Sequence, residues 1–249
     1  MTKVLLVGET WLTSETHFKG FDSFGSASLL SGAGPLLAAM ERQGVEVTHL
    51  GAHDAPEHFP LESAGLAGYD VVVLSDIGAN ALLLHPDTWR HGRKRPNRLR
   101  LLAEWVQGGG GLAMAGGYLS FQGIEGKAAY RRTPVEEVLP CTIDPWDDRV
   151  EVPEGFSPQP TAVAHPVVAG IDGDWPDLLG YNRFTAREDA TVLAAHGEDP
   201  ILAVREVGGG RTLAWASDIG PHWCPEEFLS WEGYSRLWAQ SFAWLAGRV

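Results

Sequence analysis

Short runs of aliphatic and β-branched residues alternate with amphipathic segments along the chain, and no other feature limits its fold as strongly. The runs at 3–8, 70–76 and 111–117 are apolar at most consecutive positions. Continuous hydrophobicity of this kind is typical of parallel strands that are covered on both faces. The sequence therefore predicts an α/β protein with a mainly parallel sheet between layers of helices.

The segments between these runs carry helix signals. Residues 35–44 have apolar positions at helical spacing and end at Gly44, a residue type suited to a helix C-terminus. Residues 97–107 show the same spacing and stop at a run of four glycines. Residues 234–247 form a third amphipathic segment at the end of the chain. Each is expected to pack on the sheet.

The second half of the chain predicts further strands at 149–155, 190–197, 201–207 and 211–218. Three glycines join the last two, which is typical of a hairpin. We therefore expect the sheet to gain antiparallel strands in its C-terminal part. The sequence contains no low-complexity linker, and a single domain over residues 1–249 is predicted.

The net charge is -13 and the isoelectric point is about 5.0, so nucleic acids and anionic membranes are repelled at long range. The basic run at 90–100 is interpreted as a solvated loop before a helix. Two cysteines, no signal peptide before the first strand and no membrane-length apolar run predict a cytoplasmic protein. Ten tryptophans indicate core packing or a subunit interface, and we expect a homo-oligomer.

A repeated Ser-Asp-Ile-Gly sequence ends two of the predicted strands and places Asp76 and Asp218 directly after them. Ligands of open α/β sheets bind beyond the carboxyl ends of the strands. Each aspartate could instead cap the following turn, but the pair together favours a site for acid–base chemistry or a ligand. His222 lies close to Asp218 in the sequence. Asn80 follows the first copy of the repeat and Trp223 follows the second, and both are candidate ligand-binding residues.

The turn after residues 111–115 is the third candidate element of the site. Ser120, Phe121 and Gln122 are expected to line a small polar cavity with an aromatic wall. Tyr118 suits either a hydrogen bond or proton donation to a ligand, or the simpler role of roofing the pocket. Ser120 suits a helix cap or a hydrogen bond within the turn.

The segment 8–25 follows the first predicted strand and reads as a long loop that is rich in Phe and Trp. It places Glu9 and Trp11 at the same sheet edge as the two aspartates. Long loops at this edge often carry function. The aromatic content indicates a lid over the site or an oligomer contact.

Four sequence blocks carry a resemblance to a known family: residues 116–140, 164–170, 208–223 and the closing aromatic helix. Over essentially its whole length the chain resembles the glutamine amidotransferase-like family of the class I glutamine amidotransferase-like superfamily. The resemblance implies a flavodoxin-like three-layer sandwich.

Active class I amidotransferases carry a cysteine on a sharp turn after the central strand, and a His and a Glu complete a triad. In this chain the corresponding turn reads Gly-Gly-Tyr-Leu at 116–119, with Tyr118 and no thiol. The resemblance therefore implies the fold and the ancestry, and it does not carry glutaminase activity to this chain.

Other residues that suggest chemistry have simpler interpretations. Cys224 lies two positions after His222 but lacks the exposed turn that a thiol nucleophile needs, and Cys141 is expected to be buried. The glycines at 108–111 precede a strand, so they do not form a phosphate-binding loop. His49, His53 and His58 flank Pro56 and indicate a hydrated loop. We predict no metal and no cofactor.

These features predict a pocket that binds a small polar metabolite. If the protein is an enzyme, acid–base or hydrolytic chemistry led by Asp218 and His222 is expected, with Tyr118 as a third catalytic candidate. The alternative is a non-catalytic binding or homo-oligomeric assembly module. Genuine glutamine hydrolysis is a third hypothesis.

Overall fold

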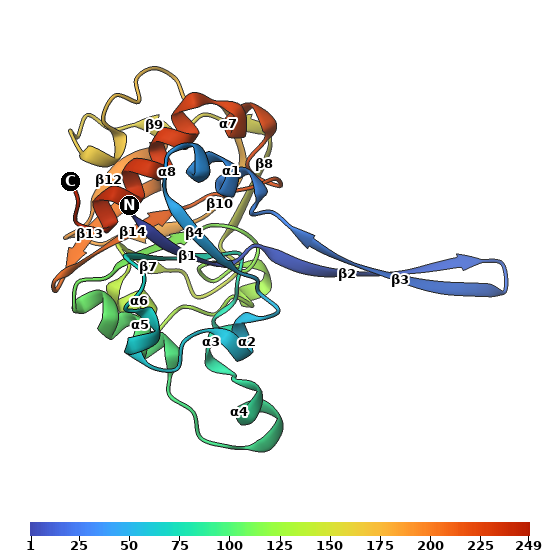
Figure 1. Ribbon diagram of the computed structural model, residues 1–249. Helices are drawn as coiled ribbons and strands as arrows, with labels where there is room; N and C mark the ends of the chain where they lie inside the picture. Colours follow the sequence, from blue (N-terminus) through green and yellow to red (C-terminus); the bar gives the residue numbers. More distant parts are fainter.

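A computed structural model describes residues 1–249 and shows one large mixed sheet with smaller ribbons around it (Figure 1). The strand order in the large sheet is β4-β1-β5-β6-β14-β13-β12-β9. The strands of this sheet are β1 (Lys3–Gly8), β4 (Glu46–Leu50), β5 (Val71–Ser75), β6 (Gly111–Ala115), β9 (Gln159–Pro160), β12 (Thr191–His196), β13 (Asp199–Val207) and β14 (Gly210–Trp215). Neighbours from β4 to β14 are parallel.

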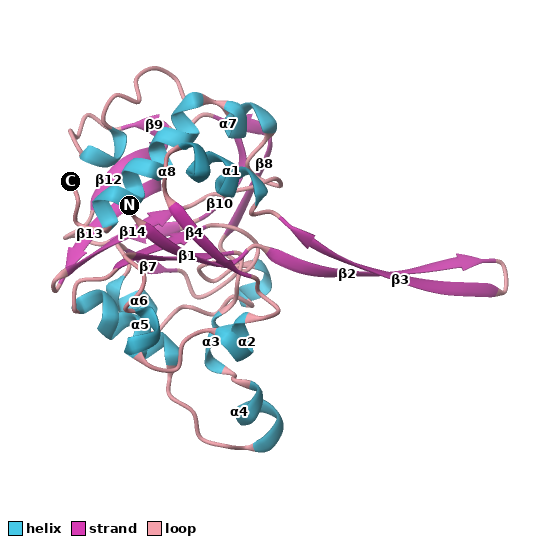
Figure 2. Cartoon of the chain, viewed as in Figure 1, coloured by secondary structure: helices cyan, strands magenta, loops and turns pink.

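Helices lie on both faces of the sheet, as the layers in Figure 2 show. Helices α1 and α8 pack against each other on one side, and α2, α3, α5 and α6 gather on the other. The helices are α1 (Gly34–Arg42), α2 (Ala55–His58), α3 (Ala79–Leu83), α4 (Pro86–His91), α5 (Arg98–Gln107), α6 (Pro134–Val138), α7 (Glu226–Ser230) and α8 (Glu232–Leu245). The predicted α/β layering, with a mainly parallel sheet, is confirmed.

The central strands form the core. Every residue of β5 and β6 is buried, and the buried apolar side chains of the protein form a single cluster of 60 residues. The continuous hydrophobic runs of the sequence thus correspond to strands covered on both faces. None of the helices is both long and apolar enough to cross a bilayer.

The antiparallel strands of the C-terminal half are also confirmed, because β13 pairs antiparallel with both β12 and β14. One predicted strand lies elsewhere. Residues 149–155 belong to β8 (Arg149–Phe156), which pairs with β10 (Leu178–Asn182) in a separate ribbon. Its side chains alternate between half-buried and exposed positions, so it suits a ribbon on the surface of the body. A third small ribbon pairs β7 (Cys141–Ile143) with β11 (Phe184–Ala186).

The prediction of a long loop at residues 8–25 is wrong. Residues 10–31 form a β-hairpin, β2 (Thr10–Lys19) and β3 (Asp22–Ser31), that extends from the body as an arm (Figure 1). Gly20, with φ 64°, lies in its two-residue turn. Thr10 and Trp11 at the base of the arm contact the body, and most other residues of both strands are exposed. The sequence of the arm therefore lacks the apolar–polar alternation that marks an ordinary strand.

The turn after β6 also differs from a nucleophile elbow. No helix follows it directly, because residues 116–133 form irregular chain with one short 3-10 turn (Ile124–Gly126) before α6. Gly117 and Gly123 have positive φ values of 135° and 72°, which let the chain fold back on itself. The turn is therefore a tight connection rather than a strand-to-helix elbow.

Arg98 binds the helices on one face together. Its guanidinium is fully buried and donates to the backbone carbonyls of Leu82 at 2.5 Å and of Ala55 and Phe59 at 3.2 and 3.3 Å. Burial lowers the pKa of Arg98 to about 10. The end of the basic run thus serves as a structural cation, since it satisfies carbonyls at the C-terminal ends of α2 and α3.

Candidate functional site

Residues that follow four neighbouring parallel strands meet in one cavity of about 460 Å³. Glu9 follows β1, Asp76 follows β5, Tyr118 follows β6 and Asp218 follows β14. The carboxyl ends of parallel strands lie at the same edge, so the fold itself brings these side chains together. The cavity is lined by Glu9, Trp11, Asp76, Tyr118, Leu119, Ile124, Asp218, Pro221 and His222.

Asp218 and His222 form a hydrogen-bonded pair at the wall of the cavity. The distance between His222 Nδ1 and Asp218 Oδ2 is 2.9 Å, and the same carboxylate oxygen accepts the backbone N–H of Trp223 at 2.9 Å. The Asp218 side chain is 8 % exposed, whereas His222 is 43 % exposed. The hydrogen bond to Asp218 raises the pKa of His222. Nε2 of His222 makes no hydrogen bond to the protein, so it is free to meet a ligand.

Glu9 is a buried carboxyl on the opposite side of the cavity. Its Oε1 accepts a 2.6 Å hydrogen bond from the Ser75 hydroxyl. Its Oε2 packs so closely on Gly32 that a Cβ there would lie 2.5 Å away. Burial, together with smaller effects of the nearby Asp218 and Asp76 carboxylates, raises the pKa of Glu9 to about 8. At neutral pH Glu9 is therefore mostly the uncharged acid.

Asp76 lies between these two groups. Its Oδ1 accepts the backbone N–H of Leu119 at 2.7 Å, and its own N–H donates to the Ser120 hydroxyl at 3.0 Å. Burial raises the pKa of Asp76, and Asp218 adds to the effect. The hydroxyl of Ser120 thus holds the turn in place, one of the two simpler roles expected for it.

The backbone around the cavity is strained. Glu9, Asp76 and His222 have positive φ values of 54°, 45° and 127°, although none is a glycine. Residues in such conformations cluster at functional sites, where the surrounding structure holds them. Gly117 has φ 135°, and a Cβ at this position would lie 2.8 Å from Asp218 Oδ1 and 3.0 Å from Asp76 Oδ1. Only glycine lets both carboxylates approach this point.

The ring of Tyr118 forms an aromatic wall. It meets the His222 ring edge-on at 4.5 Å, and the Arg149 guanidinium lies 4.8 Å from its centre on the other side. Its hydroxyl donates to Glu151 Oε1 at 3.2 Å. The Trp223 indole N–H donates to Glu151 Oε2 at 2.9 Å. Glu151, on β8, therefore fixes both aromatic side chains from behind the cavity.

Two N–H groups of the turn already have acceptors within the protein. Gly117 N–H donates to Asn182 Oδ1 at 2.9 Å, and Leu119 N–H donates to Asp76. An oxyanion hole needs free N–H groups aimed at the developing charge. Cys141 and Cys224 are fully buried, and burial raises the pKa of both thiols well above the usual range. The site therefore lacks a thiol nucleophile, and the N–H donors of Gly117 and Leu119 are already engaged.

The structure brings together six of the residues singled out in the sequence: Glu9, Trp11, Asp76, Tyr118, Asp218 and His222. Ser120 and Trp223 lie directly behind the lining, 2 % and 1 % exposed. No group of three or more His, Cys, Asp or Glu side chains has a geometry suited to a metal ion.

Three expected lining residues lie elsewhere. Phe121 is fully buried and packs on Phe184 at 5.2 Å, because its positive φ of 51° turns it into the core. Asn80 is exposed on α3 and lines a different hollow, together with Trp89. Gln122 donates to Gly126 O at 3.5 Å, outside the cavity lining.

No local sequence pattern indicates the groups that support the turn. Asn182 is fully buried on β10 and donates from Nδ2 to Asp148 Oδ1 at 2.8 Å. Asp148 in turn accepts the backbone N–H groups of Gln122 and Gly123 at 2.8 and 2.9 Å. These residues belong to the segment around the β8–β10 ribbon, whose place beside the turn depends on tertiary packing and not on any local pattern.

Comparison with known proteins places this geometry in a family. Residues 3–247 match the family described as "Putative glutamine amidotransferase". The chain is similar to two cytoplasmic proteins of Salmonella typhimurium, STM3548 and STM1381, with identities of 42 % and 41 % and TM-scores of 0.94. The first alignment covers 97 % of this chain and 98 % of the relative, and the second covers 98 % and 99 %.

A more distant structure is a thua-like protein of Parabacteroides merdae, 15 % identical with a TM-score of 0.59. That alignment covers 100 % of this chain and 91 % of the other, and it shows a shared fold alone. None of the proteins of curated function matches the sequence.

Proposed function

The chain belongs to the glutamine amidotransferase-like family, and from this membership we propose that its pocket binds a small polar metabolite and acts on it by acid–base, hydrolytic chemistry without a thiol. Membership in the family accounts for the fold, and so for the sheet edge at which the cavity lies. The side chains at that edge suit a chemistry that needs no acylated cysteine.

The observation that carries the proposal is the 2.9 Å hydrogen bond between Asp218 and His222 at the cavity wall. A carboxylate on Nδ1 orients the ring and leaves Nε2 to take a proton from a water molecule or a ligand hydroxyl. The raised pKa of His222 makes it a stronger base than an isolated imidazole. A base of this kind activates water directly, so no covalent intermediate is required.

The two other carboxyl groups suit the role of acids. Glu9, with a pKa of about 8, holds its proton at neutral pH, and the pKa of Asp76 is raised in the same direction. A neutral carboxyl can donate to a hydroxyl, carbonyl or leaving-group oxygen of a ligand. The acidic lining disfavours anionic ligands. We therefore expect an uncharged or cationic ligand that carries hydrogen-bonding oxygens.

Glutamine hydrolysis is the chemistry that the pocket supports least. The lining contains no cysteine, and the turn N–H groups of Gly117 and Leu119 are engaged by Asn182 and Asp76. We further propose that the chain acts in the cytoplasm, the location stated in the names of both Salmonella relatives.

The test begins with the ligand that co-purifies with the protein, identified by comparing native and denaturing mass spectra. Turnover of that ligand is then measured for the wild type, Asp218→Asn and His222→Gln. Each substitution is expected to lower kcat by about 10²-fold or more, because general acid–base catalysis contributes on that order.

The matched control is His85→Gln. His85 also lies beside an aspartate, with 3.9 Å between His85 Nδ1 and Asp87 Oδ2, but it belongs to the cap of α4 and lies outside the cavity. Its turnover should equal that of the wild type. Unchanged kcat in His222→Gln contradicts the catalytic role and leaves a binding module. Ammonia release from glutamine that is lost with Cys141→Ala or Cys224→Ala contradicts the proposal altogether.

A further inference from the structure

We propose that the β2–β3 arm docks onto a second copy of this chain through one uncharged face of the hairpin. The arm projects away from the body and is paired with no other strand (Figure 1). Beyond Trp11, none of its residues lines the cavity, so it does not cover its own site. This inference is independent of the proposed chemistry.

The arm exposes more apolar surface than an isolated hairpin can carry. Its large hydrophobic residues are exposed by 41 % to 110 % of their surface: Trp11, Leu12, Phe18, Phe21, Phe24, Leu29 and Leu30. A two-stranded hairpin on its own is marginally stable in water. Leu12, Phe18 and Leu29 share one face of the hairpin, and exposed apolar surface of this amount marks an interaction site. The arm therefore needs a partner surface to cover it.

The strand register divides the arm into two unlike faces, because paired residues project on the same side and successive residues alternate. One face carries all of the charged residues, Glu15, Lys19 and Asp22, together with His17. The other face carries no ionisable side chain. It consists of Thr10, Leu12, Ser14, Thr16, Phe18, Ser23, Gly25, Ala27, Leu29 and Ser31. We call this second set the uncharged face.

The absence of charge on this face favours a second copy as the occupant. A two-fold contact places the same patch of each subunit against itself, so a charge near the axis meets its own like charge. The chain carries a net charge of -13, and most of its surface repels another copy. The uncharged face avoids this repulsion. A basic partner would instead select acidic side chains, which this face lacks.

The dimensions of the arm also suit a subunit contact. The uncharged face runs along the full length of two ten-residue strands and presents ten residues to a partner. Small side chains such as Ser14, Gly25 and Ala27 make the middle of the face flat, with Leu12, Leu29 and Phe18 at its two ends. A flat face of this composition can stack on another sheet at about 10 Å.

Docking of the arm would also fix one wall of the cavity. Trp11 lines the cavity and belongs to the second residue pair of the hairpin, and Gly32 N–H donates to Glu9 O at 3.0 Å where the two strands leave the body. An arm held by a partner therefore limits movement of Trp11 and of the Glu9 backbone. The site is expected to be complete only in the assembled protein.

The test compares two pairs of charges that differ only in the face on which they lie. Ser14→Glu with Ala27→Glu places a cross-strand pair on the uncharged face, whereas Thr13→Glu with Ser28→Glu places the neighbouring pair on the other face. Both variants add the same charge, and both put like charges opposite each other within the hairpin. Molar mass is measured by sedimentation over a range of concentrations.

The wild type is expected to be a dimer or larger assembly at micromolar concentration. The uncharged-face variant should raise the dissociation constant by about 100-fold or more, because juxtaposed like charges cost several kcal/mol. The control pair should change it by no more than about threefold, as exposed substitutions usually do. A monomeric wild type, or equal effects of the two pairs, overturns the proposal.

A second measurement follows the arm directly. Both native cysteines are fully buried, so Ser14→Cys introduces an accessible thiol on the uncharged face and Glu15→Cys one on the other. The labelling rate of Ser14→Cys should fall by more than about tenfold when the protein concentration is about 100 times the dissociation constant. Glu15→Cys should label at a constant rate. Protection of neither thiol while the protein is assembled places the interface elsewhere and overturns the assignment.

Discussion

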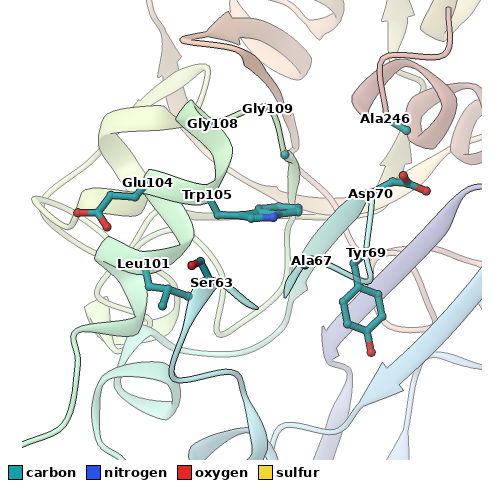
Figure 3. A pocket seen from close by; sticks show the side chains of 11 residues that line it. Ser63, Ala67, Tyr69, Asp70, Leu101, Glu104, Trp105, Gly108, Gly109 and Ala246 are labelled. Atoms are coloured by element: carbon teal, nitrogen blue, oxygen red, sulfur yellow. The ribbon is translucent and has the colours of Figure 1, made fainter. Parts of the chain in front are cut away.

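The main sheet has a hollow at each end of its parallel strands, one at the amino edge and one at the carboxyl edge. The larger of the two contains the simpler chemistry. At the amino ends of the strands, a hollow of about 590 Å³ lies between α5, the start of β5 and the end of α8. Figure 3 shows Trp105 crossing it, with Asp70 and Glu104 on opposite sides. The cavity at the carboxyl ends, about 460 Å³, contains three carboxyl groups and an imidazole.

The polar groups of the amino edge are occupied or dispersed. Asp70 accepts the backbone N–H of Lys3 at 2.8 Å and pairs with Arg248 at 2.9 Å. The glycines at 108–110 end α5, and a Cβ at Gly110 would lie 2.5 Å from the Trp105 ring. Gly110 therefore allows the chain to pack closely against the Trp105 ring.

The difference teaches that strand direction, and not the volume of a hollow, decides where functional groups converge. Four parallel strands deliver the residues that follow them to one edge, where Glu9, Asp76 and Asp218 share a single space. The amino edge receives chain arriving from helices and loops, and its side chains point apart. Three substitution experiments probe this contrast.

The largest expected effect concerns the polar network that supports the carboxyl edge. Asn182→Ala removes the acceptor of Gly117 N–H and one donor to the buried Asp148 carboxylate. Gly117 N–H is then buried without an acceptor, and Asp148 keeps only the backbone donors of Gln122 and Gly123, so the free energy of unfolding should fall by about 3 kcal/mol. Chemical denaturation measures this change.

Asp70→Asn provides the matching change at the amino edge. It weakens a pair whose side chains are 32 % and 42 % exposed, so about 1 kcal/mol or less should be lost. Equal losses in Asn182→Ala and Asp70→Asn would remove the distinction between a buried network at one edge and solvated pairs at the other.

The next experiment compares the effects of glycine substitutions at the two edges on stability and ligand affinity. Gly117→Ala places a methyl group between Asp76 and Asp218 at a backbone φ of 135°, so we expect about 2 kcal/mol of strain and loss of ligand affinity. Gly110→Ala meets the Trp105 ring and should lower stability by a similar amount while affinity is unchanged. Calorimetry measures both quantities, and a loss of affinity in Gly110→Ala would contradict the contrast.

The last effect, about 1 kcal/mol for each pH unit, is a pH dependence that arises from Glu9. Its pKa is about 8 in the folded protein, against 4.5 in an unfolded chain, so the folded state binds the extra proton between these values. The stabilising effect of that proton is complete at low pH and is lost as the pH rises towards 8. Relative to Glu9→Gln, the wild type should lose about 1 kcal/mol of unfolding free energy per pH unit in this window. Parallel stability curves for the two proteins would show that Glu9 is ionised in the cavity.

Much of the sheet could be predicted because its signals are local. The apolar runs of β1, β5 and β6 are continuous, and Asp76 and Asp218 each follow such a run directly. Once the strands are parallel, the edge at which both aspartates lie is determined. The position of His222 beside Asp218 follows from the short distance between them along the chain.

The rest depends on contacts that no local pattern encodes. The arm was interpreted as a loop because its strands bury no face, so its Ser- and Thr-rich alternation lacks the hydrophobic contrast of an ordinary strand. The direction of Phe121 depends on a single backbone angle. Asn182 reaches Gly117 across 65 residues of sequence, through a ribbon whose position is set by packing.

The hydrogen bond from Leu119 N–H to Asp76 limits the chemistry that a thiol in this turn could perform. A Tyr118→Cys substitution would place a thiol next to an amide that already serves a carboxylate, and beside a buried acidic neighbour that disfavours a thiolate. Such a variant is expected to lack thiol-dependent activity unless Asp76 is changed as well. Any redesign of this turn for acyl transfer must therefore begin by removing the carboxylate that now holds it.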